Sequence, residues 1–141
     1  MVAQALHPGQ GRPQHLRLVL SGEAGNYVEV LNRLVGPTWL EMYQARRANE
    51  VLELVRFSAP DAVVLDEQEV DALKLLKSIR RVNQGLLVVL LTGRMDRRWL
   101  EEALRLAAFS VLAKPLHLEQ LLVQIQRMMI RLDVAVRRQT L

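Results

Sequence analysis

Three residues of types that take part in nucleophilic chemistry on anions each follow a short apolar segment of the chain. Asp66 ends the segment AVVLD, Thr92 ends LLVVLLT, and Lys114 ends SVLAK. A carboxylate can act as a nucleophile, an ammonium group neutralises an anion, and a hydroxyl donates a hydrogen bond to it. If these side chains meet, they form a reactive site. The alternative is that each is only the polar end of a buried strand or a surface residue.

The elements that must position these residues alternate regularly between strand-like and helix-like patterns. The expected strands are residues 16–20, 39–44, 62–65, 86–92 and 110–113, and the expected helices are residues 26–34, 48–57, 70–82, 97–107 and 118–138. Five β-then-α units with short connections predict an α/β fold with a parallel sheet and helices on both faces. Because functional crevices in such sheets lie beyond the carboxyl ends of the strands, Asp66, Thr92 and Lys114 are expected at one edge.

Composition narrows the class of protein. Half of the 141 residues are apolar and 24% are charged, which is typical of a single globular domain. The chain has no cysteine, and its longest apolar run, residues 86–91, is too short to span a bilayer. The Gly- and Pro-containing residues 1–14 are expected to be a flexible lead without a secretory signal, ahead of a domain over residues 15–141. These features indicate a cytoplasmic protein that is not in a membrane.

The net charge of +4 comes mostly from arginines that are spread over several expected helices. They include Arg33, Arg46, Arg80, Arg97 and Arg131. No interleaving of aromatic and basic residues accompanies them, and no DNA-binding motif is present. We therefore expect solvated helix faces and no nucleic-acid surface.

Three segments in this order resemble the receiver domain of bacterial two-component response regulators. They are VVLD ending at Asp66, VVLLTG with Thr92, and SVLAKPLHLEQLL with Lys114-Pro115, and the resemblance extends over residues 15–130. It implies a flavodoxin-like (CheY-like) three-layer sandwich, in which the five-stranded parallel sheet has the order 2-1-3-4-5.

The resemblance also implies roles for the residues at the strand ends. Asp66 would be the phosphoacceptor, Lys114 the cation that binds the phosphoryl group, and Thr92 the hydroxyl that couples phosphorylation to a loop shift. Pro115 would follow a cis peptide bond that aims Lys114 inward. Such a chain is not an enzyme beyond phosphorylating itself from a phosphodonor, and it needs no cofactor except Mg²⁺ when it is phosphorylatable.

The metal site departs from the family pattern. Where receivers place two acidic residues after the first strand, this chain has Ser21 and Gly22, with Glu23 one residue beyond. The loop after Asp66 is about two residues shorter than usual, which displaces the backbone carbonyl of Gln68. The candidate ligands are therefore Glu23, Asp66 and the Gln68 carbonyl, a weak set for the near-octahedral geometry of Mg²⁺.

A further departure concerns the signal. The family usually has an aromatic residue three positions before the lysine, and here that position is Val111, which has no large alternative rotamer. Together these losses favour a degenerate pseudo-receiver, in which Asp66 and Lys114 form a structural ion pair. A functional receiver phosphorylated on Asp66 is the alternative. A remote alternative is a flavodoxin-like FMN binder, because residues 21–26 (SGEAGN) superficially resemble a phosphate loop.

The last expected helix carries an apolar stripe that is longer than one sheet requires. The stripe consists of Leu118, Leu121, Ile125, Met128, Leu132 and Ala135, widened by Leu122, Met129 and Val136. Its first turns are expected to pack on the sheet. Its distal part suggests a homodimer through the C-terminal helices, in addition to a protein partner that is a histidine kinase or an output protein.

Overall fold

The computed structural model describes residues 15–67, 71–94 and 96–132. The strands are β2 (Leu16–Ser21), β3 (Leu40–Ala45), β4 (Ala62–Asp66), β5 (Leu87–Thr92) and β6 (Ser110–Ala113). The helices are α1 (Val28–Leu34), α2 (Ala48–Phe57), α3 (Ala72–Val82), α4 (Arg97–Arg105) and α5 (Leu118–Arg131), and a 3-10 helix, η2 (Gly22–Tyr27), precedes α1.

The five strands form one parallel sheet in the order β3-β2-β4-β5-β6. In chain order this is 2-1-3-4-5, so the predicted fold is confirmed. The chain first adds β3 on one side of β2 and then continues through β4, β5 and β6 on the other side. The direction of winding therefore changes between β2 and β4, and this is the place where sheets of this kind bind ligands.

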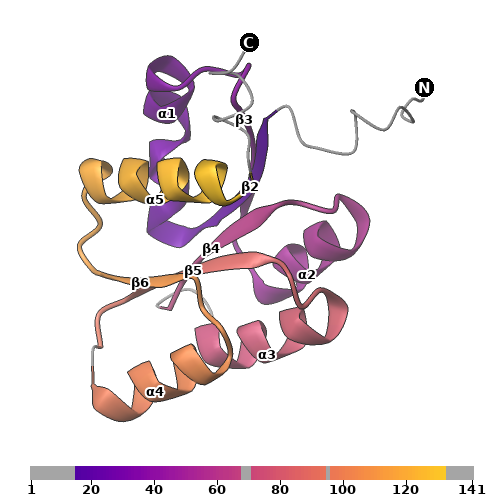
Figure 1. Cartoon of the computed structure of the whole chain (residues 1–141), viewed down its shortest axis with the longest axis vertical. Coiled ribbons are helices and arrows are strands. Elements are labelled where there is room, and N and C mark those ends of the chain that lie inside the picture. Colours follow the sequence, from indigo (N-terminus) through magenta and orange to yellow (C-terminus); the bar gives the residue numbers. More distant parts are fainter. Residues whose placement is uncertain (1–14, 68–70, 95, 133–141) are drawn as a thin grey trace.

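The helices form a layer on each face of the sheet. Figure 1 shows α1 and α5 on one face and α2, α3 and α4 on the other. A separate apolar cluster fills the space between the sheet and each helix layer. All residues of β4 and β5 are buried, as expected for central strands that are covered on both faces. The α5 residues Leu121, Ile125, Met128 and Met129 pack into the core.

Most element bounds agree with the predicted ones within one or two residues, but the segment after β2 differs. A regular helix was expected from residue 26, whereas residues 22–27 form the 3-10 helix η2. Gly22 begins this turn with a φ of 58°, a left-handed conformation that glycine adopts without strain. The predicted 118–138 helix agrees with α5 as far as Arg131. Its last residues, and the expected lead over residues 1–14, lie outside the described residues.

One arginine corrects the expectation of solvated helix faces. The Arg80 guanidinium group is half-buried and donates to the carbonyl groups of Leu106 (3.0 Å), Leu86 (2.8 Å) and Ala107 (2.9 Å). Burial lowers its pKa from the usual range. Arg80 thus satisfies carbonyl oxygens at the C-terminal end of α4 and before β5, which helical periodicity alone does not reveal. No helix in the described ranges is long and apolar enough to cross a membrane.

Candidate functional site

The parallel register brings the polar strand ends to one edge of the sheet. Asp66, the last residue of β4, pairs with Leu91 of β5, and Thr92 pairs with Ala113 of β6. Lys114 follows β6 directly, and Ser21 ends β2. The structure therefore places the three predicted residues at the same edge, although they lie up to 48 positions apart in the chain.

The Asp66 carboxylate is enclosed by hydrogen-bond donors. Only 1% of the residue is exposed. Its Oδ1 accepts from the Lys114 ammonium group at 2.8 Å, and its Oδ2 accepts from the backbone N–H of Glu23 at 2.8 Å. A buried carboxylate needs such partners because removing a charge from water is costly. Each carboxylate oxygen is consequently bonded within the protein.

Glu23 lies beside this pair as a second carboxylate. Its Oε1 is 3.7 Å from Lys114 Nζ, and its Oε2 accepts from the backbone N–H of Leu116 at 2.8 Å. The Tyr27 hydroxyl donates to the carbonyl of the same Leu116 at 2.7 Å. Two side chains of η2 therefore hold the segment that follows the Lys114–Pro115 peptide bond, which is cis, as the resemblance implied. Glu23, a candidate metal ligand from the sequence, is engaged by Lys114 and by this segment.

Ser21 and Gly22 occupy the positions where the resemblance places two acidic residues. The Ser21 hydroxyl is buried, donates to the Val64 carbonyl and accepts from the Asp66 backbone N–H, both at 3.0 Å. A Cβ atom on Gly22 would lie 2.4 Å from Asp66 Oδ2 and 2.5 Å from Asp66 Cβ. No side chain fits at position 22 while Asp66 keeps this position. The sequence offered one signal for this contact, a glycine directly after the strand-end residue.

These residues do not fit a Mg²⁺ site. Within the described residues, no group of three or more His, Asp or Glu side chains is placed to hold a metal ion. The two candidate ligand carboxylates from the sequence, those of Asp66 and Glu23, both contact the Lys114 ammonium group. Mg²⁺ requires oxygen ligands in near-octahedral geometry at short distances. The predicted contribution of the Gln68 carbonyl lies outside the described residues.

The Thr92 hydroxyl forms hydrogen bonds within the loop that follows β5. The residue is fully buried, and its Oγ1 accepts from the Arg94 backbone N–H at 3.0 Å and donates to the Arg94 carbonyl at 3.2 Å. This local turn is a common alternative for threonine side chains at strand ends. Val111, at the position of the usual aromatic residue, is half-buried and packs against the cluster beneath α2, α3 and α4.

Glu67 adds a third carboxylate close to Asp66 in the sequence. Its Oε1 accepts from the backbone N–H of Ala72, the first residue of α3, at 3.0 Å. Burial raises its pKa above the usual range, although the hydrogen bond from Ala72 opposes the shift. Glu67 therefore serves the start of α3, where the helix dipole favours a negative group.

The comparisons with known proteins agree with this architecture. The response regulator receiver domain family matches residues 25–126. The chain is 28% identical over 113 residues to regulatory protein AtoC from Escherichia coli, covering 79% of this chain and 24% of that protein. It is 23% identical over 94 residues to sporulation initiation phosphotransferase F from Bacillus subtilis, covering 65% of this chain and 76% of that protein.

Solved structures show the same fold. A response regulator receiver domain protein (CheY-like) from Methanospirillum hungatei superposes with a TM-score of 0.72 at 16% identity, covering 84% of this chain and 97% of that one. A two-component response regulator from Clostridium difficile superposes with a TM-score of 0.69 at 19% identity, covering 83% and 98%.

The fold and the family match together define the class of protein. The chain belongs to the response regulator receiver domain family and is a receiver domain of a two-component system. This assignment favours the receiver interpretation over the FMN-binding alternative. The chain spans about a quarter of the length of AtoC and about three quarters of the Bacillus relative.

Proposed function

We propose that this receiver domain is degenerate and signals through protein–protein interaction without efficient phosphorylation. The observation that carries the proposal is the state of Asp66. The residue is 1% exposed, and each carboxylate oxygen is bonded within the protein, to Lys114 and to the Glu23 backbone. An attacking carboxylate oxygen must face the incoming phosphorus atom in line with the leaving group. In this arrangement neither carboxylate oxygen of Asp66 is accessible to a phosphodonor.

The charge of the site supports the same conclusion. Asp66 and Glu23 share one ammonium group, that of Lys114, so the cluster is net negative before any phosphoryl group arrives. A phosphoryl dianion approaching such a cluster is repelled unless further cations neutralise it. The position that normally supplies an acidic metal ligand is Gly22, which has no room for a side chain. The Asp66–Lys114 pair then serves the fold by tying β4 to the segment after β6.

The proposed output is binding to another protein, which is either a histidine kinase, an output protein or a second copy of the chain. The outer face of α5 supports the last of these, because Val123 and Ile130 are seven residues apart and are 48% and 53% exposed. Residues at this spacing lie on the same face of a helix. Sedimentation of a Val123→Glu, Ile130→Glu variant tests the homodimer. An unchanged oligomeric state removes this face from the proposal.

Intact-mass spectrometry after incubation with Mg²⁺ and acetyl phosphate tests the proposal directly. We expect no phosphoryl adduct under conditions that fully modify a receiver with the usual acidic pair. Asp66→Asn serves as the matched control, since it removes the nucleophile and keeps the shape of the side chain. An adduct that forms on the natural chain and is lost in Asp66→Asn contradicts the proposal and supports the phosphorylatable alternative.

A further inference from the structure

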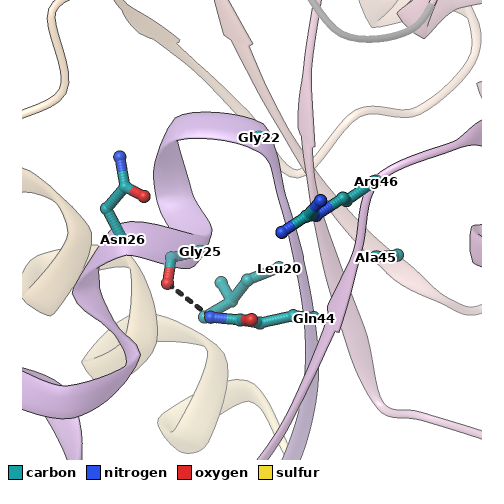
Figure 2. A pocket seen from close by; sticks show the side chains of 7 residues that line it. All are labelled: Leu20, Gly22, Gly25, Asn26, Gln44, Ala45 and Arg46. Atoms are coloured by element: carbon teal, nitrogen blue, oxygen red, sulfur yellow. Dashed lines mark hydrogen bonds between the residues drawn. The ribbon is translucent and has the colours of Figure 1, made fainter.

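A hollow lies beside the Asp66 cluster, between η2 and the carboxyl ends of β2 and β3. Its volume is about 270 Å³. It is lined by Leu20, Gly22, Gly25, Asn26, Gln44 and Arg46. Figure 2 shows the Arg46 side chain reaching from the β3 side toward η2, with Gln44 and Leu20 below it. Ligand sites for drug-sized molecules start at about 300 Å³, so this hollow suits a smaller molecule.

Arg46 gives the hollow a positive charge. Within the part of the chain that the structure describes, its guanidinium group forms no ion pair with a carboxylate. The neighbouring carboxylate of Glu50 interacts electrostatically with Arg46, and its Oε1 accepts from the backbone N–H groups of Arg46 and Arg47 at 2.8 Å. A guanidinium group presents a planar set of donors that matches a carboxylate or a phosphate group.

The other polar groups of the hollow come from amides. Gln44 Nε2 donates to the Gly25 carbonyl at 2.8 Å, which fixes the orientation of the amide and leaves its oxygen available as an acceptor. Asn26 is exposed at the opposite side of the hollow. A few polar groups around an open volume are typical of sites that recognise a small polar molecule, and here the Gln44 amide is the one with an oriented position.

Gly25 keeps the hollow open although packing does not require a glycine there. A Cβ atom at this position would lie 3.6 Å from Gln44 Nε2, an ordinary van der Waals contact, and the backbone is not in the left-handed region. This differs from Gly22, which borders the same hollow and has both a positive φ and no space for a Cβ. The missing side chain at position 25 therefore adds volume to the hollow without serving the fold.

We infer that the hollow is a binding site for a small anionic metabolite whose phosphate or carboxylate group pairs with Arg46. Its remaining polar atoms contact the amides of Asn26 and Gln44. This goes beyond the proposed function, because it supplies a chemical input to a receiver whose acceptor site is closed. The same η2 segment carries Glu23 and Tyr27, which bond to Leu116, so a bound ligand changes the stability of the contact between η2 and the segment before α5.

An NMR titration of the full-length chain tests the inference with two separate probes, inorganic phosphate and malonate, at constant ionic strength. We expect saturable shifts of the backbone amides of Gly22 and Gly25 and of the Gln44 side-chain amide. Arg46→Gln should weaken binding about tenfold, as expected for loss of a charged hydrogen bond. Arg47→Gln is the matched control, because this neighbouring arginine is exposed like Arg46 but does not line the hollow. Gly25→Met should abolish binding by filling the volume.

The two probes also distinguish the chemistry of the ligand, since tighter binding of phosphate indicates a phosphate ester and tighter binding of malonate indicates a carboxylate. Asp66→Asn should still give saturable shifts, because Asp66 does not line the hollow, so the result is separate from that of the phosphorylation test. The inference is overturned by the absence of saturable shifts with both probes, by equal weakening in Arg46→Gln and Arg47→Gln, or by shifts centred on Lys114.

Discussion

Two neighbouring regions at the carboxyl edge of the sheet differ in how far their polar groups are satisfied. Around Asp66, a carboxylate, an ammonium group and backbone N–H groups bond to one another in a buried space. Around Arg46, a guanidinium group faces an open volume of about 270 Å³. We propose that the first region is closed to a ligand and that the second binds one.

Gly22 belongs to both regions and accounts for part of the difference. Its missing side chain lets the Asp66 carboxyl group approach the backbone of η2 on one side, and it borders the hollow on the other. The topology determines where a ligand binds, and the residue types determine which ligand.

The largest expected effect comes from restoring an acidic side chain at position 22. Gly22→Asp should lower the free energy of unfolding by about 4 kcal/mol, because it combines a strained backbone with overlap and like-charge repulsion against Asp66. It should also fail to create Mg²⁺ affinity in a calorimetric titration. Gly22→Ala separates the steric part from the charge. A stable Gly22→Asp variant that binds Mg²⁺ contradicts the proposal that the Asp66 region has no room for a metal ion.

Removing the cation of the closed region should have the next largest effect. Lys114→Met leaves the buried Asp66 carboxylate without its ammonium partner, and we expect a loss of about 3 kcal/mol in urea unfolding. The double variant Asp66→Asn, Lys114→Met should lose less, since no uncompensated charge remains. Equal losses in the single and double variants would show that the pair makes no net electrostatic contribution.

Gly25→Ala should have a small effect of opposite sign. The added methyl group makes only an ordinary contact with Gln44, and the loss of glycine restricts the unfolded chain, so stability should rise by about 0.5 kcal/mol. Thermal unfolding of Gly25→Ala and of Gly22→Ala measures this difference, and the two variants are matched because both glycines border the hollow. A destabilised Gly25→Ala variant would indicate that Gly25 is required by the fold.

The smallest effect concerns Glu67, next to the closed region. Burial raises its folded-state pKa above the usual 4.5, so its carboxyl group favours the folded state most below that pH. This contribution is lost as the pH rises through the folded-state pKa. Glu67→Gln cannot ionise and keeps an acceptor for Ala72, so its stability relative to the natural chain should increase between about pH 4 and about pH 7. Urea unfolding at both pH values measures this difference, and a pH-independent difference contradicts it.

Much of the architecture could be predicted from the sequence, because burial imposes a periodic pattern on the chain. Wholly apolar strands such as residues 87–91 indicate a sheet covered on both faces, and the order of β and α segments implies parallel strands with polar ends at one edge. The sequence alone therefore predicts that Asp66 and Lys114 lie together. The arginine pattern misled at Arg80, where side-chain bonds to carbonyl groups replace solvation.

The sequence by itself determined the five alternating units, the sheet edge at which Asp66, Thr92 and Lys114 meet, and the absence of the usual acidic pair. Only the tertiary structure decided which polar atoms bond there, namely that Thr92 closes on Arg94, that Ser21 bridges β2 and β4, and that Gly22 touches Asp66. The physical reason is that the sequence pattern is local, whereas these contacts join residues that are distant in the chain. Hydrophobic periodicity reports which face of a segment is buried, whereas hydrogen bonds between residues more than 40 positions apart depend on atomic positions that only the assembled chain defines.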